Sequence, residues 1–257
     1  MQEVFSNLDF FLLLSLFCVA FVAGFVDSIA GGGGMITIPA LLLSGIPPLE
    51  ALATNKLQST FGSASAAYHF YQKGYIDFRR YFPFAILVFV FSAIGTIGVQ
   101  FIHTEFLSKI LPFLILLFGI YFLFSPRISE EQKATTIHKG FLMLALAFLG
   151  LYDGFFGPGT GSFFILALIL LGGFGITQSL GQAKFYNFAT NIASLIFFAL
   201  GGKIIWVIGF VMGIGQLIGA NLGSRVAITY GIRIIKPLVV IMSFIMAAKL
   251  LYEQFLS

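Results

Sequence analysis

Long apolar stretches alternate with short polar ones along the whole chain. Two of the long stretches, residues 49–73 and 177–201, begin with clusters of Ser, Thr, Asn, Gln and Lys. The others approach the roughly 20 apolar residues that a helix needs to cross a bilayer, and they cover residues 10–30, 81–102, 107–124, 140–156, 204–222 and 235–252. This pattern predicts an all-α integral membrane protein, with one polytopic transmembrane domain over residues 1–257.

Two further apolar pieces, residues 35–45 and 161–172, are too short to span a bilayer, since each would be only about 18 Å long as a helix. They follow the glycine-rich runs "GGGG" (Gly31 to Gly34) and "GPGTG" (Gly157 to Gly161). Non-helical backbone at membrane depth must be satisfied by protein or by a water-filled cavity. We therefore expect two helix breaks, each followed by a short broken or re-entrant helix. The alternative is that the glycines only allow close helix packing.

The two breaks belong to a longer internal repeat. "DSIAGGGG" from Asp27 aligns with "DGFFGPGT" from Asp153, and "EALATNKLQSTFGS" aligns with "SLGQAKFYNFATN", so that Lys56 matches Lys184. We interpret the chain as two tandem homologous repeats, about 8–124 and about 139–252. The loop 125–138 joins them.

The basic residues favour an inverted relationship between the repeats. Loops 73–80, 125–139 and 224–236 hold nine Lys and Arg residues, and three more lie near other segment ends. If the short pieces cross the membrane, there are ten segments and the three loops share one side, as the bias of basic residues toward the cytoplasm requires. Both termini would then lie outside, and the repeats would be inverted, as in many secondary transporters. With eight segments, the twelve Lys and Arg residues divide less unevenly between the two sides of the membrane, at eight against four.

Composition agrees with a membrane protein and excludes several other classes. The 257 residues are 59% hydrophobic and 9% charged, with a mean hydropathy of +1.01, whereas a soluble domain carries about 25% charged residues. The net charge of +4 is scattered, so nucleic acid is not an expected partner. Without a Walker P-loop or a G-x-S-x-G motif, we expect no enzyme activity and no cofactor. The expected partners are a small anion and the bilayer, and the chain could be a monomer or a homo-oligomer.

Lys56 and Lys184 are the main candidates for a binding site. A lysine at mid-membrane costs about 2.5–3.5 kcal/mol, so it is commonly functional, although one at a segment end can also reach the surface. The free N–H groups at the start of each short helix would add further donors for an anion. The candidate substrate-binding residues are Lys56, Lys184, Asn55, Gln58, Gln182, Asn187, Gly32, Gly33, Gly34, Gly159, Thr160 and Gly161.

Asp27 and Asp153 each stand at the end of a span beside a break. Either aspartate could couple protons, pair with a lysine, or cap the broken turn, and the sequence leaves these roles open. A cation or metal permease built on the two aspartates is the weaker alternative, because few other carboxylates lie within the apolar segments. We expect no resident metal. A non-transporting assembly factor is a third possibility.

These motifs resemble a known family. "GFVDSIAGGGGMITIPALLLSGIPPLEALATNK", followed in the second half by "GFFGPGTGSFF" and "SLGQAKFYNFATN", is similar to the two signatures of the TauE/SafE sulfite exporter family. The resemblance covers residues from about 8 to 252. It implies a permease of the cytoplasmic membrane that exports sulfite, an organosulfonate or another small oxyanion. The sequence departs from the family pattern at Gln182 and Ala183, where Thr or Ser is expected beside the lysine.

Overall fold

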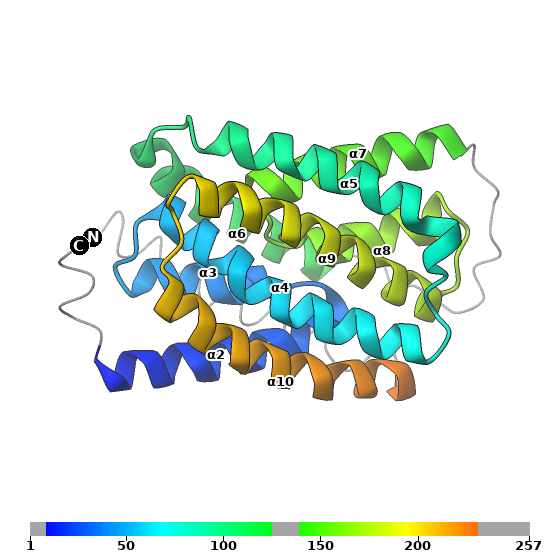
Figure 1. Cartoon of the computed structure of the whole chain (residues 1–257), viewed down its shortest axis with the longest axis horizontal. Coiled ribbons are helices and arrows are strands. Elements are labelled where there is room, and N and C mark those ends of the chain that lie inside the picture. The colour runs from blue at the N-terminus through cyan, green and yellow to red at the C-terminus, as the bar shows by residue number, and fades with distance from the viewer. Residues whose placement is uncertain (1–8, 125–138, 231–257) are drawn as a thin grey trace.

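The computed structural model describes residues 9–124 and 139–230, and it is all-helical over these ranges (Figure 1). Most of the helices lie roughly along one common axis and pack side by side. In chain order they are α2 (Phe10–Ala30), α3 (Gly34–Leu43), α4 (Pro48–Gln72), α5 (Phe78–Val99), α6 (Thr104–Phe124), α7 (Lys139–Phe155), α8 (Thr160–Leu170), α9 (Ile176–Leu200) and α10 (Trp206–Tyr230).

The prediction of an all-helical membrane protein is confirmed. Within the described ranges, three helices are long and apolar enough to cross a bilayer, and they cover Phe10–Ala30, Phe78–Val99 and Trp206–Ile228. The short apolar pieces are the separate helices α3 and α8, of 10 and 11 residues. The predicted segment 235–252 and the connecting loop lie outside the described residues.

Local sequence explains where the two polar helices α4 and α9 begin and end. Proline is favoured at the first position of a helix, where its missing N–H is not needed, and α4 begins with Pro48. Gly74 follows the end of α4 with a φ of +76°, which glycine adopts readily. Gly175 precedes α9 and Gly201 follows it. Turn residues therefore delimit both 25-residue helices.

Helices from the two halves of the chain interleave. From the first half, α2 and α4 pack against α10 of the second half, and α5 of the first half packs against α7 and α9 of the second. We call α2, α4 and α10 the first bundle, and α5, α7 and α9 the second bundle. The two bundles meet chiefly where α4 contacts α9. Neither half of the sequence therefore forms a separate body.

Small residues bring the helices of each bundle close together. In the first bundle, Gly215, Gly219 and Gly223 form a stripe along α10 that packs on the backbone of α2; a methyl group at Gly215 would lie 2.6 Å from the Phe17 carbonyl oxygen. In the second bundle, a methyl group at Gly150 of α7 would lie 2.8 Å from the carbonyl oxygen of Val88. Such small-residue seams are typical of helices that associate within a membrane.

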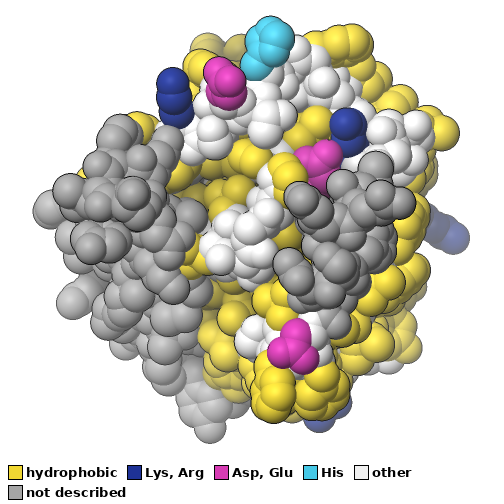
Figure 2. All heavy atoms as spheres, turned by 90° about the vertical axis from the view of Figure 1, so that its left-hand side faces the viewer, with side chains coloured by type: hydrophobic (Ala, Val, Ile, Leu, Met, Phe, Trp, Pro, Cys, Tyr) yellow, Lys and Arg dark blue, Asp and Glu magenta, His cyan; other side chains and the backbone are white. Residues whose placement is uncertain are grey.

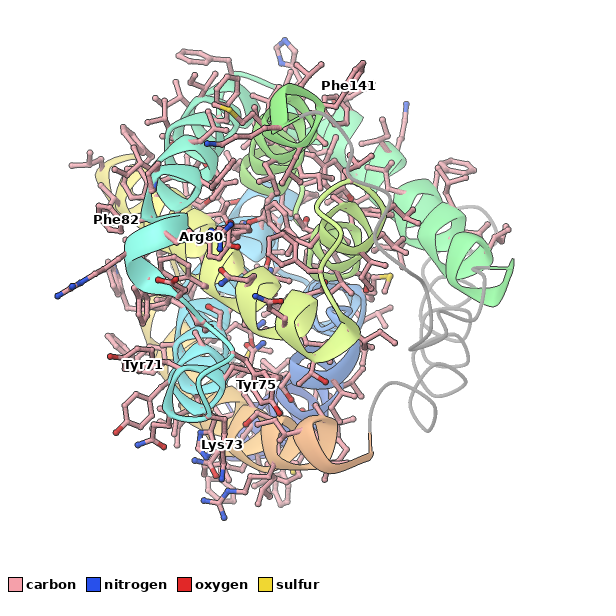
Figure 3. The ribbon with its side chains drawn as sticks, turned by 90° about the vertical axis from the view of Figure 1, so that its right-hand side faces the viewer. Tyr71, Lys73, Tyr75, Arg80, Phe82 and Phe141 are labelled. Carbon is pink, nitrogen blue, oxygen red and sulfur yellow. The ribbon has the colours of Figure 1, made fainter. Side chains whose placement is uncertain are left out.

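The helices of each bundle run in one direction, and the two bundles run in opposite directions (Figure 1). In the predicted repeat, α2 corresponds to α7 and α4 corresponds to α9. An inverted repeat requires the two helices of each pair to run in opposite directions, as they do here, and the repeat itself stays a prediction. The ends of α4 and α10 and the starts of α5 and α7 lie together at the right of Figure 1. Figure 3 shows Lys73 and Arg80 at this end, and Figure 2 shows acidic and basic side chains together at the opposite end.

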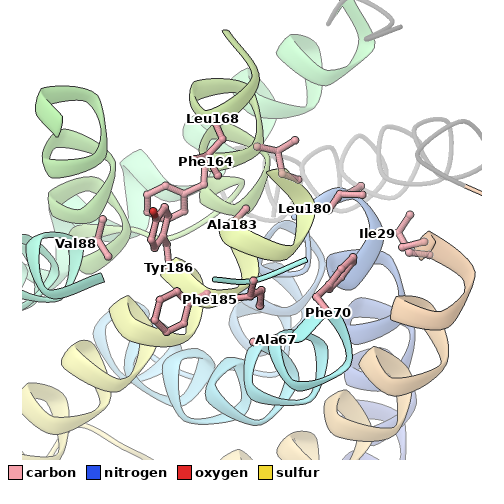
Figure 4. Packing of buried hydrophobic residues seen from close by; sticks show 14 of the residues in the cluster. Ile29, Ala67, Phe70, Val88, Phe164, Leu168, Leu180, Ala183, Phe185 and Tyr186 are labelled. Carbon is pink, nitrogen blue, oxygen red and sulfur yellow. The ribbon is translucent and has the colours of Figure 1, made fainter. Parts of the chain in front are cut away.

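A large hydrophobic cluster joins the two bundles next to the short helix α8. Phe70 of α4, Val88 of α5, Phe164 of α8 and Tyr186 of α9 are buried in it (Figure 4). The Phe164 and Tyr186 rings lie 5.9 Å apart in an edge-to-face arrangement, which is favourable for aromatic pairs. This packing fixes the rotation of α9, and therefore which of its residues face the polar centre of the molecule.

Candidate functional site

The two helix breaks touch each other at the centre of the molecule. A methyl group at Gly161 would lie 2.7 Å from the Gly31 Cα atom, so only glycine fits at this contact. Gly31 also has a φ of +79°, which strongly favours glycine. The Ser162 hydroxyl donates a hydrogen bond to the Ala30 carbonyl oxygen and ties the start of α8 to the end of α2. The starts of α3 and α8 are thereby brought together.

Two buried ion pairs cross between the halves of the chain. The Lys184 ammonium of α9 donates a hydrogen bond of 2.8 Å to Asp27 Oδ2 of α2. The Lys56 ammonium of α4 lies 3.0 Å from Asp153 Oδ2 of α7. Both lysine side chains are at most 2% exposed. Each pair also joins the first bundle to the second, so both depend on how the bundles sit against each other.

Asp27 has a second role besides pairing with Lys184. Its Oδ1 atom accepts a hydrogen bond of 3.0 Å from the Gly33 N–H, at the N-terminus of the short helix α3. A carboxylate at this position satisfies a backbone donor and stabilises the helix dipole. The sequence left three roles open for Asp27: proton coupling, pairing with a lysine and capping of the broken turn. In the structure, Asp27 both pairs with a lysine and caps the turn.

A small polar cavity lies between the ion pairs and the two breaks. Its volume is about 20 Å³, which is room for about one water molecule. Asn55 and Lys56 from α4 face Asn187 and Asn191 from α9 across it. The complete lining is Asp27, Gly31, Gly34, Asn55, Lys56, Ser59, Asp153, Gly157, Gly161, Asn187 and Asn191. The cavity is too small for a sulfur oxyanion, so binding one requires the walls to separate.

The first turns of the short helices supply backbone donors to this cavity. Gly34 and Gly161 both line it, and within the described part of the chain neither N–H has a hydrogen-bond acceptor. Free N–H groups and the positive end of the helix dipole make such a position favourable for an anion. The starts of two helices and the Lys56 ammonium therefore line one space, and the Lys184 ammonium lies beside it on Asp27.

All the predicted substrate-binding residues except Gln182 divide into three groups. Lining the cavity are Lys56, Asn55, Asn187, Gly34 and Gly161. Lying beside it are Lys184, which pairs with Asp27, and Gln58, whose amide donates to Asn55 Oδ1 at 2.9 Å. The remaining glycines and Thr160 form the turns, and Gly33 and Gly159 directly precede α3 and α8. The Thr160 hydroxyl donates a hydrogen bond to the Gly157 carbonyl oxygen. The Gly32 carbonyl oxygen accepts one from the Met35 N–H.

Gln182 does not have the substrate-binding position that the sequence predicted for it. It is fully buried but does not line the cavity, and no described residue forms a hydrogen bond with its side-chain amide. Helical geometry explains this, because residue 182 lies on the opposite side of α9 from residues 184, 187 and 191. Proximity to Lys184 in sequence was therefore a poor guide to position.

Four lining residues were not among the predicted substrate-binding residues: Gly31 and Gly157, which belong to the predicted breaks, and Ser59 and Asn191. Helical spacing could have found two of them. Lys56 and Ser59 on α4 have the same three-residue separation as Lys184 and Asn187 on α9, and Asn191 lies one turn farther along the same face. Asn191 donates to Ser63 Oγ at 3.4 Å, which links the equivalent positions of the two helices.

Comparison with known proteins gives a consistent result. The family model described as "Sulfite exporter TauE/SafE" matches residues 16–250. A "Probable membrane transporter protein" of Haemophilus influenzae is 50% identical over 95% of this chain and 96% of its own length. "Probable membrane transporter protein YfcA" of Escherichia coli is 45% identical over 98% of this chain and 96% of its own length. No solved structure matches the chain.

Proposed function

The chain belongs to the TauE/SafE sulfite exporter family, and we propose that it carries a small sulfur-containing anion, such as sulfite or an organosulfonate, across the cytoplasmic membrane. Export is the proposed direction, as the family name suggests. The observation that supports an anion most directly is one buried polar cavity lined by Lys56, Gly34 and Gly161, with Lys184 beside it on the lining residue Asp27.

The chemistry of these donors suits a compact oxyanion. Ammonium and backbone N–H groups are strong hydrogen-bond donors to charged oxygen atoms. The Asn187 side chain adds a neutral donor at the cavity wall. In this proposal the lysines hold the negative charge, the two short helices orient the oxygen atoms, and Asn55 and Asn187 supply neutral hydrogen bonds.

Movement of the site between the two membrane faces follows from the packing. Because helices of the two halves interleave, the bodies that rock would be the first and second bundles rather than the two halves of the sequence. The α4–α9 contact lies between these bundles and carries both lysines. Separation there would enlarge the cavity and open it to one side, as alternating access requires.

Other small anions, including carboxylates, would use the same donors, and this is the main alternative. A cation or metal permease is disfavoured by the geometry, because Asp27 and Asp153 are each neutralised by a lysine within 3.0 Å. A cation at either carboxylate would meet the ammonium group as well.

Flux into liposomes that contain only the purified protein tests this function. The panel is sulfite, sulfoacetate, taurine, thiosulfate, sulfate and acetate, with protein-free liposomes as the control. We expect saturable flux of at least one sulfur-containing anion and none of divalent metal ions. Flux of acetate alone would favour the carboxylate alternative, flux of a metal alone would favour the cation alternative, and no flux at all would contradict transport.

A further inference from the structure

Four charged side chains at the central cavity form a set with no net charge. Lys56 faces Asp153, and Lys184 faces Asp27, at 3.0 and 2.8 Å. All four are largely removed from solvent, with side-chain exposures of 16% for Asp27 and 5% or less for the others. In this conformation the carboxylates occupy the places at the lysines that an incoming anion would take.

We propose that the two aspartates are tethered occupants of the anion site, and that each leaves its lysine by taking up one proton. The anion then crosses the membrane together with one proton for each of its negative charges. This inference rests on the proposed anion transport. It adds the identity of the coupling ion, the residues that carry it and the ratio of protons to substrate charge.

Electrostatics of the buried site carries the argument. A dianion that enters and takes both lysines leaves two carboxylates without partners, so the closed site would have a charge of minus two. Burying unpaired charge is very unfavourable, and such groups are neutralised instead. Two protons restore a total of zero: two ammonium groups balance the dianion, and two carboxylic acids are neutral.

The only covalent bonds that form and break in this cycle are the O–H bonds of the two carboxyl groups. As the anion binds, an O–H bond forms on each carboxyl group with a proton from the water on that side. Each ammonium keeps its protons and exchanges a carboxylate partner for the anion. When the site opens on the far side, the anion leaves, each carboxyl group releases its proton there, and the two ion pairs form again.

Few other ionisable groups could take these protons. Among the described residues, the ionisable groups that interact with the two carboxylates are Lys56, Lys184 and the Tyr152 phenol, which interacts electrostatically with Asp153. The Tyr152 hydroxyl donates to the Pro158 carbonyl oxygen at 2.7 Å, so its proton is already engaged. The Tyr186 ring packs on Phe164. The carboxyl groups are therefore the proton acceptors at this cavity.

The positions of the pairs connect protonation to movement. Both pairs join the first bundle to the second, so both must break if the bundles separate. With both pairs formed and no anion bound, the closed site is neutral, so the empty protein can return between the two membrane faces. The site that holds the anion with its protons is also neutral when closed. An anion without protons, or protons without an anion, would leave the closed site charged, which disfavours closure around it.

Transport of sulfoacetate by the full-length protein in liposomes tests the inference, since both acidic groups of this probe are ionised at neutral pH. A pH difference and a potassium diffusion potential are applied separately. We expect uptake to follow the pH difference and to ignore the potential, with about 100-fold accumulation for a difference of one pH unit, or tenfold for each proton. Net flux in either direction would follow the sum of the anion and proton gradients.

Uptake that follows the potential and ignores the pH difference would overturn the inference while leaving anion transport intact. Absence of sulfoacetate flux above that of protein-free liposomes would remove both the inference and, for this anion, the proposed function. The two failures are therefore distinguishable by a single set of measurements.

Replacing one aspartate sharpens the test. Asp153→Asn removes one proton acceptor, so accumulation at the same pH difference should fall from about 100-fold to about tenfold, and uptake should become sensitive to the potential. Glu50→Gln is the matched control, because Glu50 forms a half-buried pair with Lys203 at 3.9 Å, away from the cavity. An Asp153→Asn protein with unchanged coupling would overturn the role of this residue. If that variant does not fold, the ratio measured for the unmodified protein decides.

Discussion

The two ion pairs at the centre of the molecule join equivalent residues, yet their surroundings differ. Asp27 is hydrogen-bonded to both the Lys184 ammonium and the Gly33 N–H. Asp153 Oδ2 lies 3.0 Å from the Lys56 ammonium, and no described backbone N–H donates a hydrogen bond to this carboxylate. One carboxylate is therefore held by a lysine and a helix end, and the other by a lysine without a helix end.

This difference suggests that the two halves contribute unequally to one mechanism. A carboxylate that also caps a helix is more costly to release, because its departure leaves a backbone donor unsatisfied. Asp153 can leave Lys56 without such a loss. In the proposed cycle, Asp153 is thus the first carboxylate to take a proton, and Asp27 follows. Four sets of substitutions test how unequal the halves are.

Removal of a lysine should have the largest effect, and it should be similar in both halves. Lys56→Ala and Lys184→Ala each delete one of two positive charges at the site. Loss of one partner in a buried charge pair costs about 2–5 kcal/mol in binding, so affinity should fall at least about thirtyfold. Flux assays with the transported anion measure this. Lys203→Ala, which alters a half-buried pair away from the cavity, is the control.

If both lysine variants transport normally while remaining monodisperse, the anion site is located elsewhere. If only one of them loses transport, the two halves are less alike than the shared geometry indicates, and the remaining lysine is structural.

Alanine at the contact between the breaks should mainly affect stability. Gly31→Ala would introduce both an unfavourable positive φ and a clash with the backbone at Gly161, at a combined cost of about 3 kcal/mol. Gly45 has nearly the same φ, +78°, but open space around it. Gly45→Ala should therefore cost only about 1 kcal/mol. Thermal unfolding in detergent compares the two proteins.

The equivalent change in the second half refines this comparison. Gly157 has a φ of +90°, and a methyl group there would lie 3.2 Å from the flexible Lys56 ammonium rather than against backbone. Gly157→Ala should fall between the other two variants in stability. Equal losses for Gly31→Ala and Gly45→Ala would show that the contact between the breaks is loose.

The two aspartates should differ by a smaller amount. Asp27→Ala and Asp153→Ala both leave a buried lysine without a partner, which is strongly destabilising. Asp27→Ala also removes a helix cap, which adds about 1 kcal/mol to its cost. Chemical unfolding of the two variants, compared with Glu50→Ala as a control for the loss of a carboxylate, measures the difference. A less stable Asp153→Ala protein would contradict the assigned capping role.

The smallest effects are expected at the neutral lining residues. Asn187→Ala removes an amide that lines the cavity, and Ser59→Ala removes the hydroxyl at the equivalent position of α4. Loss of one neutral hydrogen bond is worth about 1 kcal/mol, so Asn187→Ala should weaken binding of the anion about fivefold. Ser59→Ala, a shorter side chain, should have less effect. Equilibrium binding ranks them, and a larger loss at Ser59 would reverse the proposed arrangement of donors.

Local features of the sequence were sufficient to predict the helices and the breaks. Hydropathy determines where long helices form, because each apolar stretch must be buried in lipid or protein whatever its partners. Glycine-rich runs between apolar stretches indicated where α2 and α7 end and where α3 and α8 begin. The repeated "D…GGGG" and "D…GPGTG" motifs, with one lysine after each, identified three charged residues that line the cavity and a fourth, Lys184, that pairs with one of them.

Tertiary structure alone decided how those residues pair. Lys56 is nearer in sequence to Asp27 than to Asp153, yet it pairs with Asp153, because α4 and α7 belong to different bundles that meet at the cavity. The same packing rotates Gln182 away from the site and brings Gly31 against Gly161. Hydropathy and turn propensity act over a few residues, whereas charge pairing and backbone contact depend on the positions of helices that are distant in the chain.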